Sequence, residues 1–243
     1  MSFTSNMANR EVCDLIFLDY KTKAPFLNLD FANTTTTELT GETVYAYGGK
    51  GHPKRVAFDG DKGGTVTIET QMSNIKLFEM LTGGQSIEAA KYYVREELTV
   101  SEGAVTLSDT PESGSIVAYA ADDDCGTALE TTGSGTTVTM PTGYSQTKVI
   151  VYYMKTMGTN AKALRIKGTD FPKDFIAYGD TIMKTEDGDI LPYRLTYYKL
   201  HPQPNMSLAF ANNGDPGTIT ITCDLLVDGD GNMVDLILEA EDE

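Results

Sequence analysis

The chain has 243 residues, of which 40% are hydrophobic and 22% charged, so it is long enough to bury the core of one large domain or two small ones. Its formal net charge of −16 disfavours binding to nucleic-acid phosphates, because that affinity comes mainly from Lys and Arg. No stretch approaches the roughly 18 consecutive apolar residues of a membrane-spanning helix, and the N-terminal "MSFTSNMANREV" lacks the basic and apolar regions of a signal peptide.

The N-terminal part of the chain predicts β-strands. Strand candidates lie at residues 12–18, 26–31 and 43–47. The stretch "TVTIET" at 65–70 alternates apolar and polar side chains, which is typical of a strand with one buried face.

Residues 41–64, "GETVYAYGGKGHPKRVAFDGDKGG", form an unusual segment. Its glycines and Pro53 indicate a long exposed loop or extended hairpin, and the Asp-Gly pair within 58–64 favours a tight turn. Because the segment is basic in an acidic chain, it is either a solvated loop or an arm that contacts another copy of the chain. The candidate contact residues are Lys50, His52, Lys54, Arg55 and Lys62.

One segment predicts a helix: "SNIKLFEMLTG", residues 73–83. Ser73 is the expected N-cap, and Gly83 and Gly84 end the helix. A helix this short is marginal alone, so we expect it to lie on a sheet. The side chains predicted to pack on that sheet are Ile75, Phe78 and Leu81.

The middle of the chain is rich in Thr, Ser and Gly and predicts several short strands. This pattern indicates a small β-sandwich inserted into a larger β domain. We therefore expect residues 98–157 to form the insertion, and residues 1–97 with 158–243 to form the larger, discontinuous domain. The strand candidates in and next to the insertion are residues 89–100, 115–120, 136–140 and 147–154.

Strand candidates separated by turn signals fill the C-terminal part, at residues 175–178, 193–200, 206–210 and 218–225. The last of these is the clearest, because its apolar and β-branched polar residues alternate throughout. Its expected buried side comprises Ile219, Ile221, Cys223 and Leu225, and its polar side comprises Thr220, Thr222 and Asp224.

The stretch "VDGDGNM" after this strand imitates part of a calcium loop. Oxygen ligands at loop positions 1, 3, 5 and 12 are matched by Asp228, Asp230, Asn232 and Glu239. Met233, however, stands where the loop needs glycine, and strands rather than helices are predicted on both sides. We favour the turn of a β-hairpin, with an adventitious divalent ion as the lesser alternative.

No catalytic or cofactor-binding pattern is evident. Cys13, Cys125 and Cys223 lie far apart, which argues against a disulfide framework or a zinc site and predicts small, buried thiols. His52 and His201 have no companion at helical spacing, and His201 is interpreted as a turn residue. Since no nucleophile elbow or phosphate-binding loop occurs either, we expect no enzyme activity, no cofactor and no structural metal.

The order of these elements resembles the tail tube (major tail) proteins of tailed bacteriophages. Residues 56–84 match that family's hairpin, strand and packing helix, and residues 176–236 match its closing strands with a "GDP" turn and a "D-x-DGN" turn. The resemblance covers the chain outside 98–157. It implies a mainly β fold: a tail-tube-type β-sandwich or barrel with one packing α-helix, to which an immunoglobulin-like β-sandwich has been added.

The resemblance also implies a structural virion protein, assembled in the host bacterial cytoplasm, that forms stacked hexameric rings in the phage tail. The implied partners are other copies of the chain, the tape measure protein, the tail terminator and the baseplate or tail-tip proteins, with DNA passing through the lumen without specific binding. By position, residues 41–64 correspond to the family's bridge to the adjacent ring, and Thr220, Thr222 and Asp224 are candidate lumen residues. The alternative is a β-rich virion decoration or adhesin-type binding protein.

Overall fold

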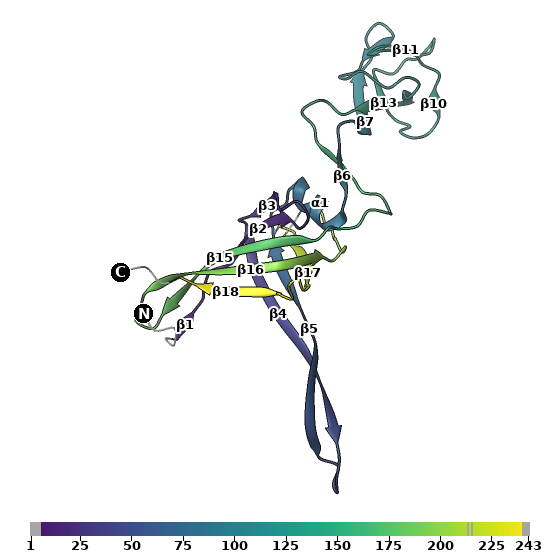
Figure 1. Ribbon diagram of the computed structural model, residues 1–243. Helices are drawn as coiled ribbons and strands as arrows, with labels where there is room; N and C mark the ends of the chain where they lie inside the picture. Colours follow the sequence, from purple (N-terminus) through teal and green to yellow (C-terminus); the bar gives the residue numbers. More distant parts are fainter. Residues whose placement is uncertain (1–5, 213, 215, 240–243) are drawn as a thin grey trace. The chain divides into compact units, whose positions relative to one another are not determined.

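The computed structural model describes residues 6–212, 214 and 216–239, so Asn213 and Asp215 of the predicted 211–218 turn lie outside the described residues. The chain divides into two compact units, Met1–Gln85 with Leu164–Glu243 and Ser86–Ala163 (Figure 1). The short strands β6 (Gln85–Ile87) and β14 (Ala163–Arg165) pair with each other. Among the described residues, no helix is long and apolar enough to cross a membrane.

The described part of the first unit is built on one nine-stranded sheet with antiparallel pairing. The order along the sheet is β3-β2-β15-β16-β17-β5-β4, with β1 beside β15 and β18 beside β16. The strands are β1 (Met7–Ala8), β2 (Asp14–Asp19), β3 (Pro25–Leu29), β4 (Ala32–Tyr47), β5 (Lys54–Thr70), β15 (Phe175–Thr185), β16 (Ile190–Pro202), β17 (Ile219–Leu225) and β18 (Val234–Leu238).

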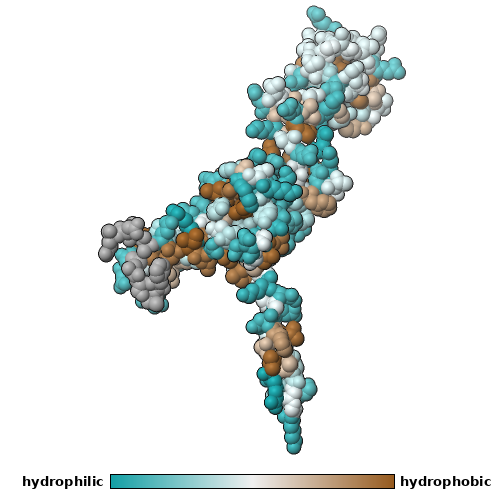
Figure 2. All heavy atoms as spheres, in the orientation of Figure 1, coloured by the Kyte–Doolittle hydropathy of each residue, from teal (hydrophilic) through white to brown (hydrophobic). Residues whose placement is uncertain are grey.

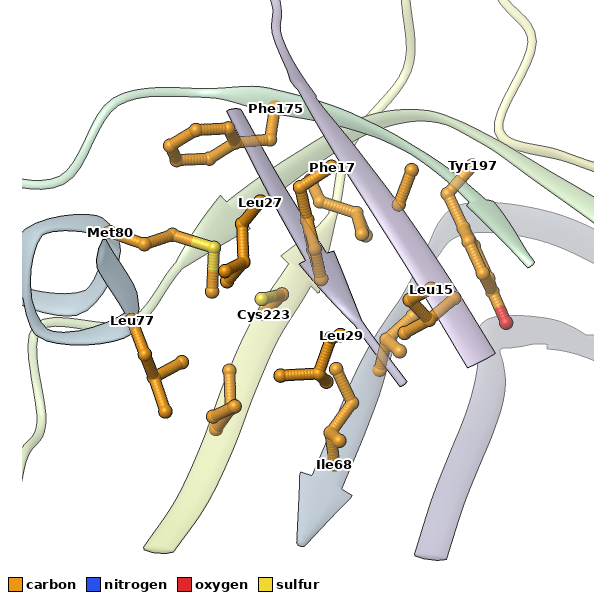
Figure 3. Close-up of a cluster of buried hydrophobic side chains, with 14 of the residues drawn as sticks. Leu15, Phe17, Leu27, Leu29, Ile68, Leu77, Met80, Phe175, Tyr197 and Cys223 are labelled. Atoms are coloured by element: carbon orange, nitrogen blue, oxygen red, sulfur yellow. The ribbon is translucent and has the colours of Figure 1, made fainter. Parts of the chain in front are cut away.

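The inward faces of these strands enclose one hydrophobic core. In β17 the predicted alternation is confirmed for Ile221, Cys223 and Leu225, which are buried, whereas Ile219 at the start of the strand is half-buried. Figure 3 shows Cys223 in the cluster with side chains from β2, β3 and β5. The larger buried residues that it labels are Leu15, Phe17, Leu27, Leu29, Ile68, Phe175 and Tyr197.

The helix α1 (Ile75–Thr82) lies where the sequence predicts it, but its cap and its buried face differ. Asn74, not Ser73, is the N-cap, because its side-chain oxygen accepts the Leu77 N–H at 2.8 Å. Of the three predicted packing residues, Leu81 is buried, whereas Ile75 and Phe78 are only half-buried. The helix instead directs Leu77 and Met80, with Leu81, into the core (Figure 3).

Gly83 ends the helix in the left-handed conformation, with φ of 68°, and its N–H bonds the carbonyl of Glu79. A Cβ at this position would lie 2.1 Å from the carbonyl oxygen of Phe171, so both the backbone angle and the neighbouring chain require glycine here.

The predicted strand at 206–210 is wrong. Met206, Leu208 and Phe210 alternate as a strand would, yet the segment is irregular, and Leu208 and Phe210 are exposed. The pairing of β16 with β17 stops at Pro202 opposite Cys223, followed only by the bond from the Gln203 N–H to the Thr222 carbonyl, and Pro204 has no N–H with which to continue the ladder.

The second unit contains two small sheets that share a hydrophobic core. Val105 and Val138 from one sheet, and Val149 and Tyr153 from the other, are buried together in that core. The strands are β7 (Lys91–Thr99), β8 (Ala104–Thr106), β9 (Val117–Ala120), β10 (Ala128–Leu129), β11 (Thr132–Ser134), β12 (Thr137–Thr139) and β13 (Lys148–Thr156). The sheet orders are β10-β9-β13-β7 and β11-β12-β8.

The predicted insertion boundaries at 98 and 157 fall inside this unit, which extends from Ser86 to Ala163. The reason is that β7 pairs with β13 along its whole length, from Lys91 opposite Thr156 to Thr99 opposite Lys148. The strand therefore belongs to this unit from its first residue.

Candidate assembly surface

The most prominent surface feature of the first unit is a two-stranded arm, residues 39–64, formed by the distal parts of β4 and β5 (Figure 1). β17 pairs with β5 only over Thr65–Thr70, so beyond this point β4 and β5 pair only with each other. At about 3.3 Å per residue, the seven residues from Gly41 to Tyr47 alone extend roughly 20 Å. The predicted extended hairpin is thus present.

The turn of the arm lies at residues 48–53, where Gly49, Gly51 and His52 have positive φ. The tight turn predicted within 58–64 is wrong, because these residues lie inside β5. The register shifts there instead: Thr40 pairs with Gly63 and Glu42 with Gly60. Asp61 and Lys62 of β5 therefore oppose the single residue Gly41 of β4, which is a β-bulge, and Asp61 has a positive φ of 46°. The Asp-Gly and Gly-Gly pairs flank this bulge and form no turn.

One face of the arm is apolar and unprotected. Val44 lies opposite Phe58, and Ala46 lies opposite Val56, which places these four side chains on the same face of the ribbon. The exposed fractions are 63% for Val44, 61% for Phe58 and 50% for Val56. Figure 2 shows apolar side chains gathered partway along the arm. An isolated two-stranded ribbon gains little stability in water, so this face is suited to burial against a partner.

The basic residues of the arm gather near its turn and hold that turn in shape. The ammonium group of Lys54 lies 3.7 Å from the ring centre of Tyr45, and the His52 ring stacks on Tyr47 at 5.6 Å. The Arg55 Nε–H donates to the carbonyl of Gly48 at 2.9 Å. Four of the five predicted contact residues thus lie at the tip: Lys50, His52, Lys54 and Arg55.

Lys62, the fifth predicted contact residue, is not part of this group. It lies near the base of the arm, where it lines a groove with Leu39, Met233 and Val234. Its separation from the tip follows from the strand pairing, because the turn lies at 48–53 and not next to Lys62.

The predicted polar residues Thr220, Thr222 and Asp224 point away from the core and belong to a larger polar face. Their cross-strand neighbours on β5 continue it, with Thr220 opposite Glu69, Thr222 opposite Thr67 and Asp224 opposite Thr65. The sequence analysis did not predict these neighbours, although β5 shows the same alternation. The pairing of β5 with β17 joins residues far apart in the chain, so no local pattern indicates it. On β4 the same face includes Thr36 and Glu38.

Strands β3, β4 and β18 are among those of the first unit that offer unpaired backbone edges. In the described part of the sheet, β3 and β4 are the terminal strands and β18 pairs only with β16. Such edges present free N–H and C=O groups that can pair with another chain.

In the turn at 227–232, the Asp228 carboxylate accepts hydrogen bonds from the backbone of the turn itself. The Asp228 Oδ1 accepts the N–H groups of Asp230 at 2.9 Å and Asn232 at 2.8 Å. Desolvation opposes ionisation of Asp228, but these donated N–H groups outweigh it and hold its pKa below the ordinary value. The guanidinium group of Arg194 donates a hydrogen bond of 2.9 Å to the Glu239 carboxylate, so Glu239 does not take part in the turn. Among the described residues, no group of three or more acidic, His or Cys side chains is arranged to hold a metal.

The hairpin predicted around this turn is also wrong. β17 and β18 flank the turn, but both pair with β16: Leu200–Pro202 with β17, and Tyr193–Tyr197 with β18. The two strands therefore follow one another along one edge of β16 instead of pairing with each other.

The cysteines and His201 depart in part from expectation. Cys13 and Cys223 are buried, and burial raises the pKa of Cys13 to about 11 and that of Cys223 to about 12. Cys125 is exposed, contrary to the prediction of a buried thiol. His201 lies within β16 rather than in a turn, and its Nδ1 is 2.7 Å from an Asp174 carboxylate oxygen.

Comparison with protein families identifies the family of the chain. The model of the YomU/Tube protein family matches residues 10–236, a span that includes both units, the arm and the polar face. No curated protein matches the chain.

Proposed function

Because the chain belongs to the YomU/Tube protein family, we propose that it is the subunit of a phage tail tube. In this proposal it is a structural virion protein and not an enzyme. Copies of it assemble into hexameric rings, and the rings stack into a hollow tube that serves as the conduit for DNA ejection.

The observation that carries the proposal is the combination of free sheet edges with the arm. β3 and β4 end the sheet with unpaired backbone groups, and the arm exposes Val44, Val56 and Phe58. Both features are unfavourable for an isolated chain, since free edges aggregate and apolar faces attract partners. A ring in which each copy pairs its edges with its neighbours removes the edges, and contact of the arm with an adjacent ring covers the apolar face.

The polar face of β17, β5 and β4 is suited to line the lumen. Thr220 and Thr222 carry no charge, and Asp224, Glu69 and Glu38 are acidic. A negative wall repels DNA phosphates, so the duplex moves along it without being held. In this arrangement the tape measure protein occupies the lumen during assembly, and the tail terminator and the baseplate or tail-tip proteins close the two ends.

The second unit is a separate module with its own core and is not required for ring closure in this proposal. We assign it an immunoglobulin-like fold and a surface role on the assembled tail. A chain without residues 86–163, joined by a short Gly-Ser linker, should therefore still assemble.

Negative-stain electron microscopy of the purified full-length chain tests the proposed function. Six-fold rings or tubes over a range of concentrations are the expected result. A chain that stays monomeric at every concentration and ionic strength would overturn it and favour the decoration or adhesin-type alternative.

A further inference from the structure

The turn between β15 and β16 combines exposed carboxylates with exposed apolar side chains. Glu186, Asp187 and Asp189 are all exposed. Ile190 follows them directly and is 57% exposed, and Ile182 is 38% exposed. Ile182 lies opposite Pro192 and Ile190 opposite Lys184, which places both isoleucines on the same face of the β15–β16 pair. We call residues 182–190 the acidic end.

Hydrogen bonds hold the acidic end in a defined shape. The buried Thr185 donates its N–H to the carbonyl of Asp189 at 2.9 Å, and its Oγ1 accepts the Asp189 N–H at 3.0 Å. The Gly188 N–H bonds the Thr185 carbonyl at 3.1 Å. These bonds engage the backbone of Asp189, and its carboxylate is displayed to solvent on a preorganised turn.

The arm and the acidic end are complementary in charge and in hydropathy. The tip of the arm carries Lys50 in its turn, together with Lys54, in a chain whose formal net charge is −16. Lys54 lies opposite Tyr47, on the tyrosine face of the ribbon, and Val44, Val56 and Phe58 form the other face. On the acidic end the arrangement is similar with the opposite charge: Glu186, Asp187 and Asp189 lie in the turn, and Ile182 and Ile190 share one face of the strands beside it. Each surface therefore combines a charged turn with an apolar strand face, and the two charges are opposite.

Another turn of the first unit, 226–230, also places acidic residues beside the exposed Leu226 and Val227. Its Asp228 carboxylate, however, already accepts two backbone N–H groups and is less available to a partner. This turn therefore serves as a matched control for the acidic end.

We propose that the arm of one copy binds the acidic end of a second copy. Lys50, in the turn of the arm, faces Asp187 and Asp189, Lys54 adds positive charge at the tip, and the Val56 side of the arm covers Ile190 and Ile182. This assignment rests on the proposed function, since it names the surface that accepts the arm between successive rings. In the single chain both surfaces are exposed, so neither covers the other.

A charge exchange tests the pairing. Lys50→Glu with Lys54→Glu on the arm, and separately Asp187→Lys with Asp189→Lys on the acidic end, should each shorten or abolish tubes by at least about tenfold in mean length while rings persist. Combining all four substitutions should restore tubes. The control, Asp230→Lys on the other turn, should leave tube length unchanged.

Tubes that are unaffected by either pair, or lost in both and not restored by the combination, would overturn the inference. If the wild-type chain forms neither rings nor tubes, the proposed function itself fails, which is a different result.

Disulfide trapping gives a second measurement that does not depend on charge. In a Cys125→Ser background, which removes the exposed thiol, Val56→Cys with Ile190→Cys should form covalent multimers under mild oxidation of assembled tubes. Val56→Cys with Val227→Cys is the matched control and should stay monomeric. Multimers in the control but not in the Ile190→Cys chain would show that another surface accepts the arm.

Discussion

The hydroxyl oxygens of Thr37 and Tyr197 lie 2.6 Å apart, which joins β4 to β16 across the core of the first unit. The two strands are not neighbours in the sheet, because β17 and β5 lie between them. A second bond, from the Thr35 hydroxyl to the carbonyl of Cys13 at 3.0 Å, joins β4 to the start of β2. The sheet therefore curls back on itself and encloses its core, as expected of a β-sandwich or barrel.

Tyr197→Phe should lower the free energy of unfolding by about 1 kcal/mol, because it removes this bond from a fully buried side chain and leaves Thr37 without its partner. Urea denaturation followed by circular dichroism measures the change. Tyr178→Phe is the control, since Tyr178 is exposed and should change stability by less than about 0.5 kcal/mol. Equal effects at both positions would contradict the assignment.

Gly64→Ala should destabilise the first unit by about 1–3 kcal/mol, because an added Cβ would lie 2.2 Å from the Glu38 carbonyl oxygen on the neighbouring strand. Gly60→Ala on the same strand is the matched control, since nothing lies within 4 Å of its added Cβ. Thermal denaturation of the two variants side by side measures the difference. The prediction is wrong if Gly60→Ala costs as much as Gly64→Ala.

Asn74→Ala should cost about 1 kcal/mol of stability, because it removes the side-chain oxygen that accepts the Leu77 N–H. Ser73→Ala should cost only a few tenths, within the range of exposed substitutions. Chemical denaturation of both variants decides between the cap seen in the structure and the cap expected from the sequence. A larger loss for Ser73→Ala would favour the latter.

Val56→Ser with Phe58→Ser should leave the unfolding free energy of the unassembled chain within about 0.5 kcal/mol of wild type, because both side chains are exposed. The same variant should form rings that do not elongate into tubes. Ala57→Ser, on the opposite face of the same strand, is the control and should assemble normally. Thermal denaturation and electron microscopy supply the two readouts, and normal tubes from the double variant would show that the apolar face is not used.

Stability should fall as pH rises above about 9. The Cys223 thiol has a pKa of about 12 in the folded chain against 9.0 for a free thiol, and burial is the main cause. Because the thiol pKa is higher in the folded chain than in the unfolded chain, the thiol makes its full contribution to stability below pH 9.0. That contribution is lost as pH rises towards 12. Urea denaturation under reducing conditions at about pH 8 and about pH 10.5 measures the slope. Cys223→Ala should make the slope shallower, and an unchanged slope would contradict this origin.

Local patterns predicted much of the fold. The family match confirms the coarser part of the expected resemblance, a tube-type protein, and the mainly β class is confirmed. The buried and polar sides of β17 follow from period-two alternation, which is a property of a single strand. The helix was placed within two residues of its observed start, because apolar spacing and Gly83 are local signals as well.

The errors share one physical cause, which is that strand partners are not a local property. Residues 206–210 alternate but do not extend the pairing of β16 with β17, which stops at Pro202, and the Asp-Gly pair at 59–60 lies within a strand because its partner is β4. For the site, the sequence predicted a basic arm but not its apolar face, since the pairing of Val44 with Phe58 sets which side chains share a face.

Spacing and composition alone predict most of the strands with one apolar side, the position of α1, and the exposed basic segment at 41–64, because each of these is encoded locally. Three features come from the tertiary structure: β17 and β18 share one edge of β16, β4 curls over β2 and β16, and the arm turns at 48–53. These features depend on hydrogen bonds and packing between residues that are far apart in the chain. Many strand pairings would satisfy the same alternation of apolar and polar residues, and the packing of the enclosed core selects one of them.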